Sequence, residues 1–354
     1  MPFCRRCGTK LEENARFCYK CGTPAGNFIS APAAPVRSLR HDPLFWIVTS
    51  VIVIVLVAVV VSVVVFAPIY EVTFNKTNQD SSSGVNTLNL NFQSDNAQVN
   101  IITQNVTDKN ILINVSAEGS RSIFGSENSI QVTFTNESSN GVLTVNSKVI
   151  QTGLMTNAHV VCDIYVNPLL KLNLNVTSTT GEVSLTANAP ATVQSLNLEA
   201  TTGTVQANLE RNVTVSGDIS LKAQIGAVYY RMNKAKVQGN CTINLQSATG
   251  SVDMEITEEK TLQGNLQVNA ATTTGAIDVG LQIDGDVGAK IVSQTGQFGS
   301  IHVDKENFSG NQSPIQSNNF PAQSNIQINN SVSSFGDINI NASYVSSVTP
   351  SGRN

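Results

Sequence analysis

The chain has 354 residues, a length that suits about two domains, and 41% of its residues are hydrophobic, which is enough for folded cores. Only 13% of the residues are charged, about half the usual share in soluble domains, and the formal net charge is −4. The low charge argues against a typical cytosolic enzyme. The negative sign argues against binding to the phosphate backbone of nucleic acids.

Four cysteines near the start of the chain form two closely spaced pairs. Two residues separate Cys4 from Cys7 and Cys18 from Cys21, so the pattern is C-x2-C-x10-C-x2-C. Each pair lies in a copy of the motif F-C-x-[RK]-C-G-T. Two such turns can present four thiolates to one tetrahedral ion, so we predict that Cys4, Cys7, Cys18 and Cys21 bind one structural Zn²⁺. Four protein ligands leave no open position for catalysis.

Residues 3–24 resemble the short zinc-ribbon domain at the start of many prokaryotic, especially archaeal, membrane proteins. The resemblance implies a zinc ribbon over residues 1–24, and on so small a segment the metal would supply most of the folding free energy. We expect Phe3 and Phe17 to fill its core. We also expect the ribbon to contact an unknown protein partner rather than nucleic acid, because its basic residues also fit a membrane-topology signal.

An apolar segment follows the ribbon. Residues 25–43 are rich in Pro and Ala and are expected to form a flexible linker. Leu44–Ala67 then contains 24 residues without a charge, broken only by one Thr and two Ser. About 20 apolar residues cross a bilayer, so residues 44–67 are predicted to form one transmembrane helix. A buried strand or core helix rarely stays uncharged over this length, and the apolar region of a cleaved signal peptide is shorter.

Charge differs sharply on the two sides of this segment. Residues 1–43 contain seven Lys or Arg and three acidic residues, whereas the part after residue 67 contains fourteen basic and twenty-two acidic residues. The positive-inside rule therefore predicts a cell-membrane protein with a cytoplasmic N-terminus and an extracellular C-terminal domain. A cytoplasmic location also favours zinc over two disulfides for the four cysteines, because thiols there stay reduced.

The chain repeats itself over residues 169–348. Serine/threonine-glycine turns recur in a first glycine series, with a degenerate copy at Gly226, and a second glycine series runs between them, so two corners recur in each period. Between the corners apolar residues alternate with polar ones, as in Leu196, Leu198 and Ala200, which is the pattern of a strand with one buried face. The first series comprises Gly181, Gly203, Gly226, Gly250, Gly275 and Gly296, with a late copy at Gly336, and the second comprises Gly217, Gly239, Gly264 and Gly285.

Short strands and fixed glycine corners at this period predict a β-solenoid, because one repeat buries its apolar row only when a neighbour stacks on it. A β-sandwich is the alternative, since frequent turns also suit it. Over about residues 170–300 the corners resemble the hydrophobic-x-T-x-G-x-[IV] motif of the bacterial and archaeal "putative adhesin" family of extracytoplasmic β-solenoid domains. The expected fold class is therefore mainly β.

Three other regions complete the β prediction. Residues 70–168 alternate in the same way but have fewer corners, and we expect diverged repeats or a capping sheet. Residues 302–325 are rich in Asn, Gln and Ser and are expected to form a polar surface loop. Cys162 and Cys241 are expected to be buried and unbonded, because about three repeats would separate them.

Residues three and five positions after each corner glycine are expected to point outward in rows across the strands. In the first row Asp253 and Asp278 would be adjacent, as calcium binding or glycoside hydrolysis requires. No nucleophile motif or histidine cluster converges on them, so we expect a solvent-exposed row and no enzyme activity. The first row comprises Ser184, Gln206, Tyr229, Asp253 and Asp278, and the second comprises Thr186, Asn208, Arg231 and Glu255.

These features predict a single-pass membrane-anchored surface protein with a cytoplasmic zinc ribbon and an extracellular adhesin-like domain. That domain would have a structural role or bind a surface glycan or protein. A transmembrane adaptor or sensor, coupling an outer ligand to a cytoplasmic partner, is an alternative. A carbohydrate-active enzyme is a weaker one, because the residues needed for catalysis do not converge.

Overall fold

The computed structural model describes residues 3–25, 43–65, 69–122, 130–152, 155–259 and 262–345, and in the helix it describes the side chains of residues 46–60. The chain divides into two compact units, Met1–Ala67 and Pro68–Asn354. Most of the predicted linker, residues 26–42, lies outside the described residues, as do residues 346–348 at the end of the predicted repeats.

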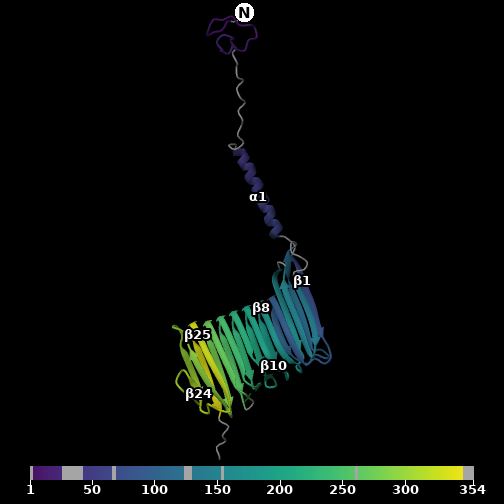
Figure 1. Ribbon diagram of the computed structural model, residues 1–354, viewed down its shortest axis with the longest axis vertical. Helices are drawn as coiled ribbons and strands as arrows, with labels where there is room; N and C mark the ends of the chain where they lie inside the picture. The colour runs from purple at the N-terminus through teal and green to yellow at the C-terminus, as the bar shows by residue number, and fades with distance from the viewer. Residues whose placement is uncertain are drawn as a thin grey trace, which may run out of the picture. The chain divides into compact units, whose positions relative to one another are not determined.

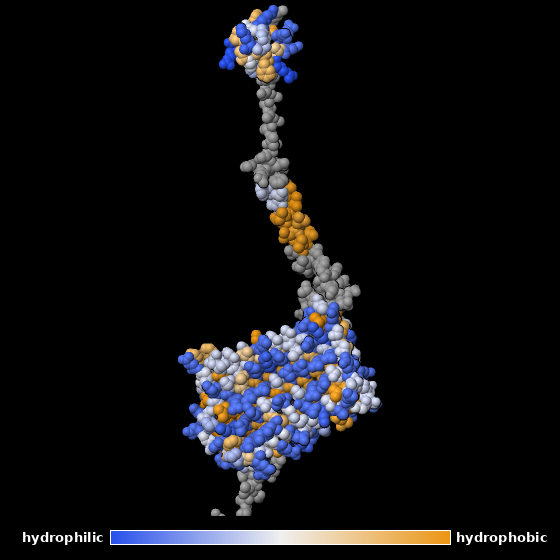
Figure 2. All heavy atoms as spheres, in the orientation of Figure 1, coloured by the Kyte–Doolittle hydropathy of each residue, from blue (hydrophilic) through white to orange (hydrophobic). Residues whose placement is uncertain are grey.

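The first unit contains the ribbon and one helix, α1 (Pro43–Val65). The described side chains of α1 are almost all exposed and apolar, and its hydrophobic character is visible in Figure 2. Within the residues that the structure describes, no helix has both the length and the hydropathy needed to cross a membrane. In the ribbon, antiparallel bridges join Phe3 to Lys10 and Phe17 to Pro24, and each closes one cysteine turn.

The second unit, called here the β domain, consists of strands in two large sheets (Figure 1). Among its described residues the 11-stranded sheet contains, in spatial order, β1 (Ile69–Asp80), β4 (Ile111–Ser122), β7 (Met155–Val166), β3 (Gln98–Thr103), β9 (Val183–Ala187), β11 (Val205–Leu209), β14 (Val228–Asn233), β17 (Val252–Glu258), β20 (Ile277–Asp284), β26 (Ile338–Val345) and β22 (Ile301–Glu306). The main run of the 15-stranded sheet contains, in spatial order, β23 (Phe308–Ser309), β24 (Ile315–Ser317), β21 (Val287–Gln294), β25 (Ser324–Phe335), β19 (Leu266–Thr274), β16 (Cys241–Thr249), β13 (Ile219–Ile225), β10 (Thr192–Thr202), β8 (Lys171–Thr180), β2 (Thr87–Asn96), β6 (Val142–Gln151) and β5 (Ile130–Ser139). The short strands β12 (Thr214–Val215), β15 (Lys236–Gln238) and β18 (Leu262–Gln263) complete this sheet.

Each central repeat contributes one long strand to each sheet, and three of the repeats add a short strand, β12, β15 or β18, to the 15-stranded sheet. β10 pairs in parallel with β13, with Leu196 opposite Ile219, and the following strands β11 and β14 pair in parallel with Val205 opposite Val228. Equivalent residues of successive repeats therefore lie side by side. The prediction of a mainly β fold is confirmed.

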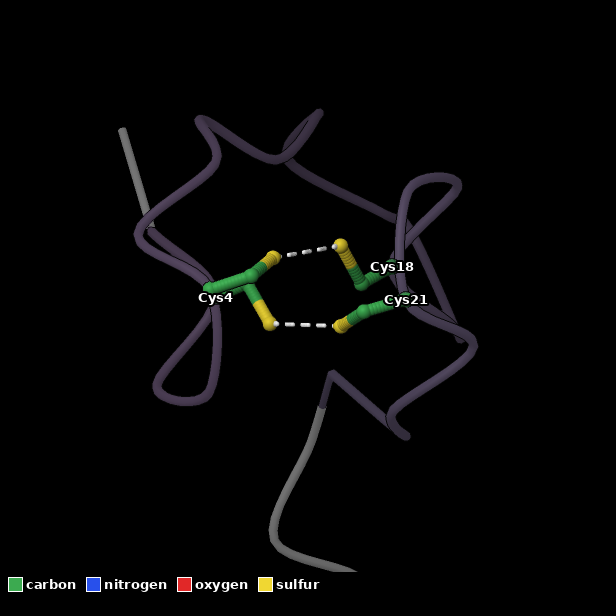
Figure 3. A group of neighbouring side chains, drawn as sticks. Cys4, Cys18 and Cys21 are labelled. Carbon is green, nitrogen blue, oxygen red and sulfur yellow. Dashed lines mark hydrogen bonds between the residues drawn. The ribbon is translucent and has the colours of Figure 1, made fainter.

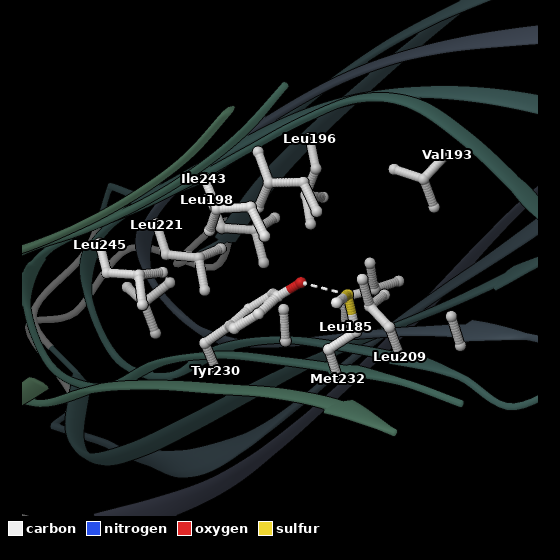
Figure 4. Close-up of a cluster of buried hydrophobic side chains, with 14 of the residues drawn as sticks. Leu185, Val193, Leu196, Leu198, Leu209, Leu221, Tyr230, Met232, Ile243 and Leu245 are labelled. Carbon is white, nitrogen blue, oxygen red and sulfur yellow. Dashed lines mark hydrogen bonds between the residues drawn. The ribbon is translucent and has the colours of Figure 1, made fainter. Parts of the chain in front are cut away.

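The hydrophobic core lies between the two sheets, as Figure 4 shows. Leu196 and Leu198 of β10 point from the 15-stranded sheet toward Tyr230 and Met232 of β14 in the other sheet. All four are at most 1% exposed, and full burial of such a side chain stabilises a fold by about 1.5–3 kcal/mol. The Tyr230 hydroxyl donates a hydrogen bond to the Met232 sulfur, 3.3 Å away, so the polar atom of this buried ring has a partner.

The corner glycines stack directly on one another. A Cβ added to Gly226 would lie 1.9 Å from the carbonyl oxygen of Gly203, and the φ of Gly226 is +139°. Both the close approach and the left-handed φ require glycine here. The stacking order predicted for the corner glycines is wrong at the C-terminal end, because Gly336 rather than Gly296 stacks on Gly275.

This difference arises because the last strands insert between two earlier repeats. β25 and β26 lie between the β19–β20 repeat and the β21–β22 repeat, in parallel with both. In Figure 1 the yellow C-terminal strands accordingly lie beside green strands rather than following them at the end of the stack. The C-terminal strands thus complete a groove described below.

The described strands within residues 70–168 pair in two ways. The strands β2 and β3 form a diverged repeat that pairs in parallel with β8 and β9 on one side and with β6 and β7 on the other. β1, β4 and β5 then add antiparallel strands at the N-terminal end. Lys76 of β1 donates to the Val132 carbonyl (2.6 Å) and lies over the Phe134 ring of β5, so it links the two sheets at this end.

The expected polar loop at residues 302–325 is not a loop throughout. It contains most of β22 and the short strands β23 and β24, and β24 pairs antiparallel with β21. Phe308 and Ile315 are 8% and 0% exposed and belong to the main core. These two apolar side chains order a segment whose composition is otherwise polar.

The two remaining cysteines behave as predicted. Cys162 in β7 and Cys241 in β16 are buried and unbonded, and they lie in different sheets. Burial raises the pKa of the Cys162 thiol to about 12 and also raises the pKa of Cys241. Both thiols are therefore protonated and unreactive in the folded protein.

Candidate metal centre and candidate binding groove

The structure brings the four ribbon cysteines together. All four sulfur atoms lie within 4.8 Å of one another, with Cys4 and Cys21 Sγ 3.5 Å apart and Cys7 and Cys18 Sγ also 3.5 Å apart. A tetrahedral zinc with Zn–S bonds of about 2.3 Å needs sulfurs separated by about 3.8 Å. Figure 3 shows the side chains of the two turns pointing toward each other. The four thiols therefore fit one tetrahedral ion.

Each cysteine turn is built in the same way. Gly8 and Gly22, which follow the second cysteine of each pair, have φ values of +66° and +73°, in the left-handed region that glycine adopts without strain. Their amides donate to the Cys4 and Cys18 carbonyls at 2.9 and 2.8 Å. The duplicated motif thus gives a duplicated backbone turn.

Threonine hydroxyls lie next to two of the sulfurs. Thr9 Oγ1 is 3.3 Å from Cys7 Sγ, and Thr23 Oγ1 is 3.2 Å from Cys21 Sγ. Hydrogen bonding with Thr9 lowers the pKa of Cys7 to about 6, and hydrogen bonding with Thr23 lowers the pKa of Cys21. These contacts favour the thiolate form of Cys7 and Cys21, which is the form that binds a metal, whereas the pKa of Cys18 is raised to about 11.

The expected aromatic core of the ribbon is wrong. Phe3 and Phe17 are 62% and 60% exposed, and the buried residues are Cys4, Cys18 and Leu11. In a domain this small Cys4, Cys18 and Leu11 occupy the interior, so the two rings lie outside. Tyr19 is also exposed, and the ribbon thus has three aromatic side chains on its surface.

A second candidate site is a groove of about 900 Å³ on the outer face of the 11-stranded sheet. Its floor is formed by four adjacent strands, β17, β20, β26 and β22. Asn311 and Gln312, between β23 and β24, also line the groove. Segments far apart in the sequence meet here because β26 inserts between β20 and β22.

Two rows of outward side chains cross the floor of the groove. In the first row strand pairing places Asp253, Asp278, Asn339 and His302 side by side. In the second row it places Glu255, Gly280, Asn341 and Asp304 side by side. The prediction that Asp253 and Asp278 are adjacent outward residues is confirmed.

The groove is acidic and only partly neutralised. Asp278 accepts a hydrogen bond from Asn339 Nδ2 (2.7 Å), and Glu255 forms an ion pair with Arg231 (3.2 Å). Asp253 has no hydrogen-bond or ion-pair partner among the described residues. Partial burial, with the nearby charges of Asp278 and Glu255, raises the pKa of Asp253.

Gly280 interrupts the second row with a position that has no side chain. Its φ is not in the left-handed region, and the nearest heavy atoms to an added Cβ are 3.7 Å away. Neither backbone conformation nor packing therefore requires glycine at this position. A glycine inside a strand without such a reason marks a place where another molecule can approach the backbone.

The Asp and Asn residues after the second glycine series have a structural role. Asp218 Oδ1 accepts from the Thr242 amide (2.9 Å), and Asn240 Oδ1 accepts from the Asn265 amide (3.1 Å). Each side chain thus caps the corresponding turn of the next repeat. In the described ranges the ribbon cysteines form the one group of three or more His, Cys, Asp or Glu side chains that lie close enough to share a metal ion.

Part of the groove is predictable from the sequence. Asp253, Asp278 and Glu255 follow from their positions after a corner glycine, whereas His302 and Asp304 were missed because their segment was expected to be a loop. The signal that could have found them is the alternation of apolar Ile301 and Val303 with polar residues.

Comparisons with known proteins agree with the class of domain that the cysteine geometry defines. Residues 3–25 match the zinc-ribbon domain family. The N-terminal domain is therefore a zinc ribbon that binds one structural zinc ion. No curated protein matches the chain.

Solved structures similar to the chain include a "putative cell adhesion protein" from Clostridium sporogenes, with 14% identity, coverage of 77% of this chain and 100% of that chain, and a TM-score of 0.37. A "putative adhesin" from Bacteroides fragilis has 14% identity, coverage of 77% and 97%, and a TM-score of 0.32. A "putative lipid binding protein" from Parabacteroides distasonis has 13% identity, coverage of 76% and 96%, and a TM-score of 0.33.

Proposed function

We propose that the protein is a single-pass membrane-anchored surface protein whose outer domain binds an extracellular ligand. In this proposal the zinc ribbon lies in the cytoplasm, residues 44–67 cross the cell membrane, and the β domain is an adhesin-like β-solenoid outside. The observation that carries the binding role is the acidic groove on the 11-stranded sheet.

Support for the membrane anchor comes from the apolar segment and the charge on its two sides. Leu44–Ala67 contains no charged residue, and basic residues predominate only before it. The described side chains of α1 are almost all apolar and exposed, as lipid contact would require. Lys and Arg in excess on one side of a span favour the cytoplasm for that side.

Support for a β-solenoid comes from strand register. Successive repeats pair in parallel in both sheets, and the corner glycines Gly181, Gly203, Gly226, Gly250 and Gly275 stack in sequence order. A β-sandwich built from hairpins would instead pair neighbouring strands mainly antiparallel. A stack of this kind presents a long outer face on which a ligand can bind across several repeats.

Support for a binding role comes from features of the groove that do not stabilise the fold. Asp253 carries a carboxylate beside two other acidic groups, and such repulsion costs stability. Gly280 weakens a strand by about 0.5–1 kcal/mol relative to alanine. Unfavourable groups gathered in a cavity are typical of a functional site.

The experiment measures binding of the full chain, purified in detergent, to cell-surface polymers of its source organism. We expect saturable binding that Gly280→Trp abolishes, because the indole would fill the groove. Asn208→Trp is the matched control, since Asn208 lies in the same outward row but three strands away and outside the groove. Binding that survives Gly280→Trp, or no binding at all, would contradict the proposed role of the groove.

A second candidate function, a transmembrane adaptor, is favoured by the surface of the ribbon. Phe3, Phe17 and Tyr19 are exposed, and exposed aromatic side chains are enriched where proteins bind one another. Crosslinking in intact membranes tests this function with the variant Phe3→Ala/Phe17→Ala, which leaves the cysteines in place. An adaptor loses a specific cytoplasmic crosslink in this variant. A crosslinking pattern unchanged from that of the parent chain excludes the adaptor role of these rings.

A further inference from the structure

We infer that the groove binds a linear oligosaccharide of amino sugars, whose ammonium groups contact the carboxylates and whose hydroxyl groups contact the carboxamides. This inference rests on the proposed function, because it names the class of ligand for the same site. It follows from the charge of the groove, from its amide groups, from the spacing of its rows and from the open position at Gly280.

The negative charge of the groove favours a cationic ligand. The groove is lined by four acidic side chains, which are Asp253, Asp278, Glu255 and Asp304. Among the described residues only Glu255 of these four forms an ion pair, and its partner is Arg231. Asp278 receives a neutral amide hydrogen bond, and Asp253 receives none among the described residues. Ammonium groups would relieve the repulsion between these neighbouring carboxylates and form charge-assisted hydrogen bonds with them.

The amide groups of the groove call for hydroxyl groups as well. Asn339 and Asn341 lie on the floor, and Asn311 and Gln312 also line the groove. A carboxamide both donates and accepts hydrogen bonds, and a sugar hydroxyl does the same. An ammonium group only donates, so a simple polyamine could not accept hydrogen bonds from the amide groups of Asn341, Asn311 and Gln312. An amino sugar carries both kinds of group on one ring.

The spacing of the rows suits an extended chain of rings. Strands in a sheet lie about 4.8 Å apart, so the four positions from Asp253 to His302 form a regular track across β17, β20, β26 and β22. A pyranose ring in an extended chain advances by a similar distance. Tyr229, which is opposite Asp253 on β14 and 41% exposed, continues the track with an aromatic face on which a ring can pack.

The open position at Gly280 gives the chain room on the floor. Asp278 precedes it on the same strand by two residues and points to the same side. The backbone at Gly280 is therefore accessible directly beside a carboxylate. A ring placed there would contact the Gly280 backbone beneath it and the second-row neighbours Glu255 and Asn341 on its two sides.

The test is calorimetric titration of the full chain in detergent with three probes. The hexamer of glucosamine carries ammonium and hydroxyl groups, the hexamer of N-acetylglucosamine carries hydroxyl groups without the charge, and spermine carries ammonium groups without the hydroxyls. We expect the glucosamine hexamer to bind at least about tenfold more tightly than either other probe. Equal binding of the acetylated hexamer or of spermine would overturn the inference, as would failure of the glucosamine hexamer to bind.

Three variants assign the binding to the groove. Asp253→Asn should weaken binding of the glucosamine hexamer about tenfold, Gly280→Trp should abolish it, and Asn208→Trp should leave it unchanged. Thermal unfolding of each variant verifies that the β domain is folded. A loss of binding in Asn208→Trp, or unchanged binding in Gly280→Trp, refutes the location.

Failure of this inference can be distinguished from failure of the proposed function. If surface polymers bind in a manner that depends on Gly280 and the glucosamine hexamer does not, the ligand class is wrong and the proposed function stands. If neither binds, both fail.

Discussion

Replacing Gly226 with alanine is expected to disrupt the stacking of two repeats. The new Cβ would lie 1.9 Å from the Gly203 carbonyl oxygen, whereas real Cβ atoms essentially never come closer than 3.0 Å to another heavy atom. One repeat must therefore move by about 1 Å relative to its neighbour, against close-packed contacts. Alanine must also adopt a φ of +139°, which L-residues rarely do.

The cost of this substitution has two parts. The unfavourable φ costs about 1–3 kcal/mol. The displacement weakens the amide hydrogen bonds on both sides of the corner, from Gly203 to Ile225 at 2.8 Å and from Gly226 to Thr249 at 2.9 Å, each worth about 1 kcal/mol. We therefore expect Gly226→Ala to lower the unfolding free energy of the β domain by about 3–5 kcal/mol.

Alanine variants at three other glycines separate the cost of the backbone conformation from the cost of the steric clash. Gly239 has a φ of +81° with no heavy atom within 4 Å of an added Cβ, so its alanine variant measures the backbone term, about 1–2 kcal/mol. Gly264 lacks the left-handed φ but would place a Cβ 2.0 Å from the Gly239 oxygen, so its variant measures the clash. Gly280 has neither feature, and Gly280→Ala should stabilise the domain by about 0.5–1 kcal/mol.

The assay is denaturant unfolding of the full chain, followed by the β-sheet circular dichroism signal. The expected order of stability is Gly280→Ala, parent chain, Gly239→Ala and then Gly226→Ala, with Gly264→Ala also below Gly239→Ala. If Gly226→Ala is no more destabilising than Gly239→Ala, the repeats do not stack at their corners, and the close approach argued above is incorrect.

Three further expectations concern the metal, the groove and the buried thiols. Metal analysis should find one zinc per chain in the parent protein and none in the variant Cys18→Ser. The unfolding midpoint of the β domain should be the same in both proteins. Zinc retained by the variant would contradict the four-cysteine site. Because the pKa of Asp253 is raised in the folded state, its destabilising effect is absent below the unfolded pKa of about 3.9 and is fully present above the folded pKa. Asp253→Asn should therefore raise the thermal midpoint at pH 7 and leave it unchanged at pH 3, and a lower midpoint at pH 7 would show that the carboxylate stabilises the fold. Cys162 and Cys241 should react with a thiol reagent only after denaturation, and fast labelling of either in the native protein would contradict their burial.

The zinc site could be predicted almost completely from the sequence. The spacing of Cys4, Cys7, Cys18 and Cys21 sets the ligands, and short-range turn geometry brings each pair together. The positions of Phe3 and Phe17 could not be predicted by the same means. Hydrophobicity favours burial, but a ribbon whose small interior holds Cys4, Cys18 and Leu11 has no room for two rings.

The central repeats were predictable because each residue's face follows from alternation and each corner from glycine. Rows such as Gln206, Tyr229 and Asp253 follow directly from position after the corner. The spatial order of the repeats at the two ends of the β domain could not be predicted in this way. Alternation specifies which face of a strand is buried and not which strand lies beside it, so the insertion of β26 between β20 and β22 left no local signal.

The groove depends on the insertion of β26 between β20 and β22, which the sequence did not predict. Asn339 and Asn341 come from an inserted strand, and Asn311 and Gln312 come from a segment whose polar composition resembles a loop. Two isolated apolar residues, Phe308 and Ile315, order this segment by packing in the core. The average composition of the segment does not reveal them.

The most direct test of the whole account is the side of the membrane on which the β domain lies. In intact cells, a membrane-impermeant maleimide should label the variant Gln246→Cys, whose new thiol would be exposed on β16, and should not label the parent chain. The ribbon cysteines should react only after the cells are permeabilised and the zinc is chelated. Labelling of Gln246→Cys that requires permeabilisation, or labelling of the ribbon in intact cells, would contradict a surface protein anchored with its zinc ribbon inside.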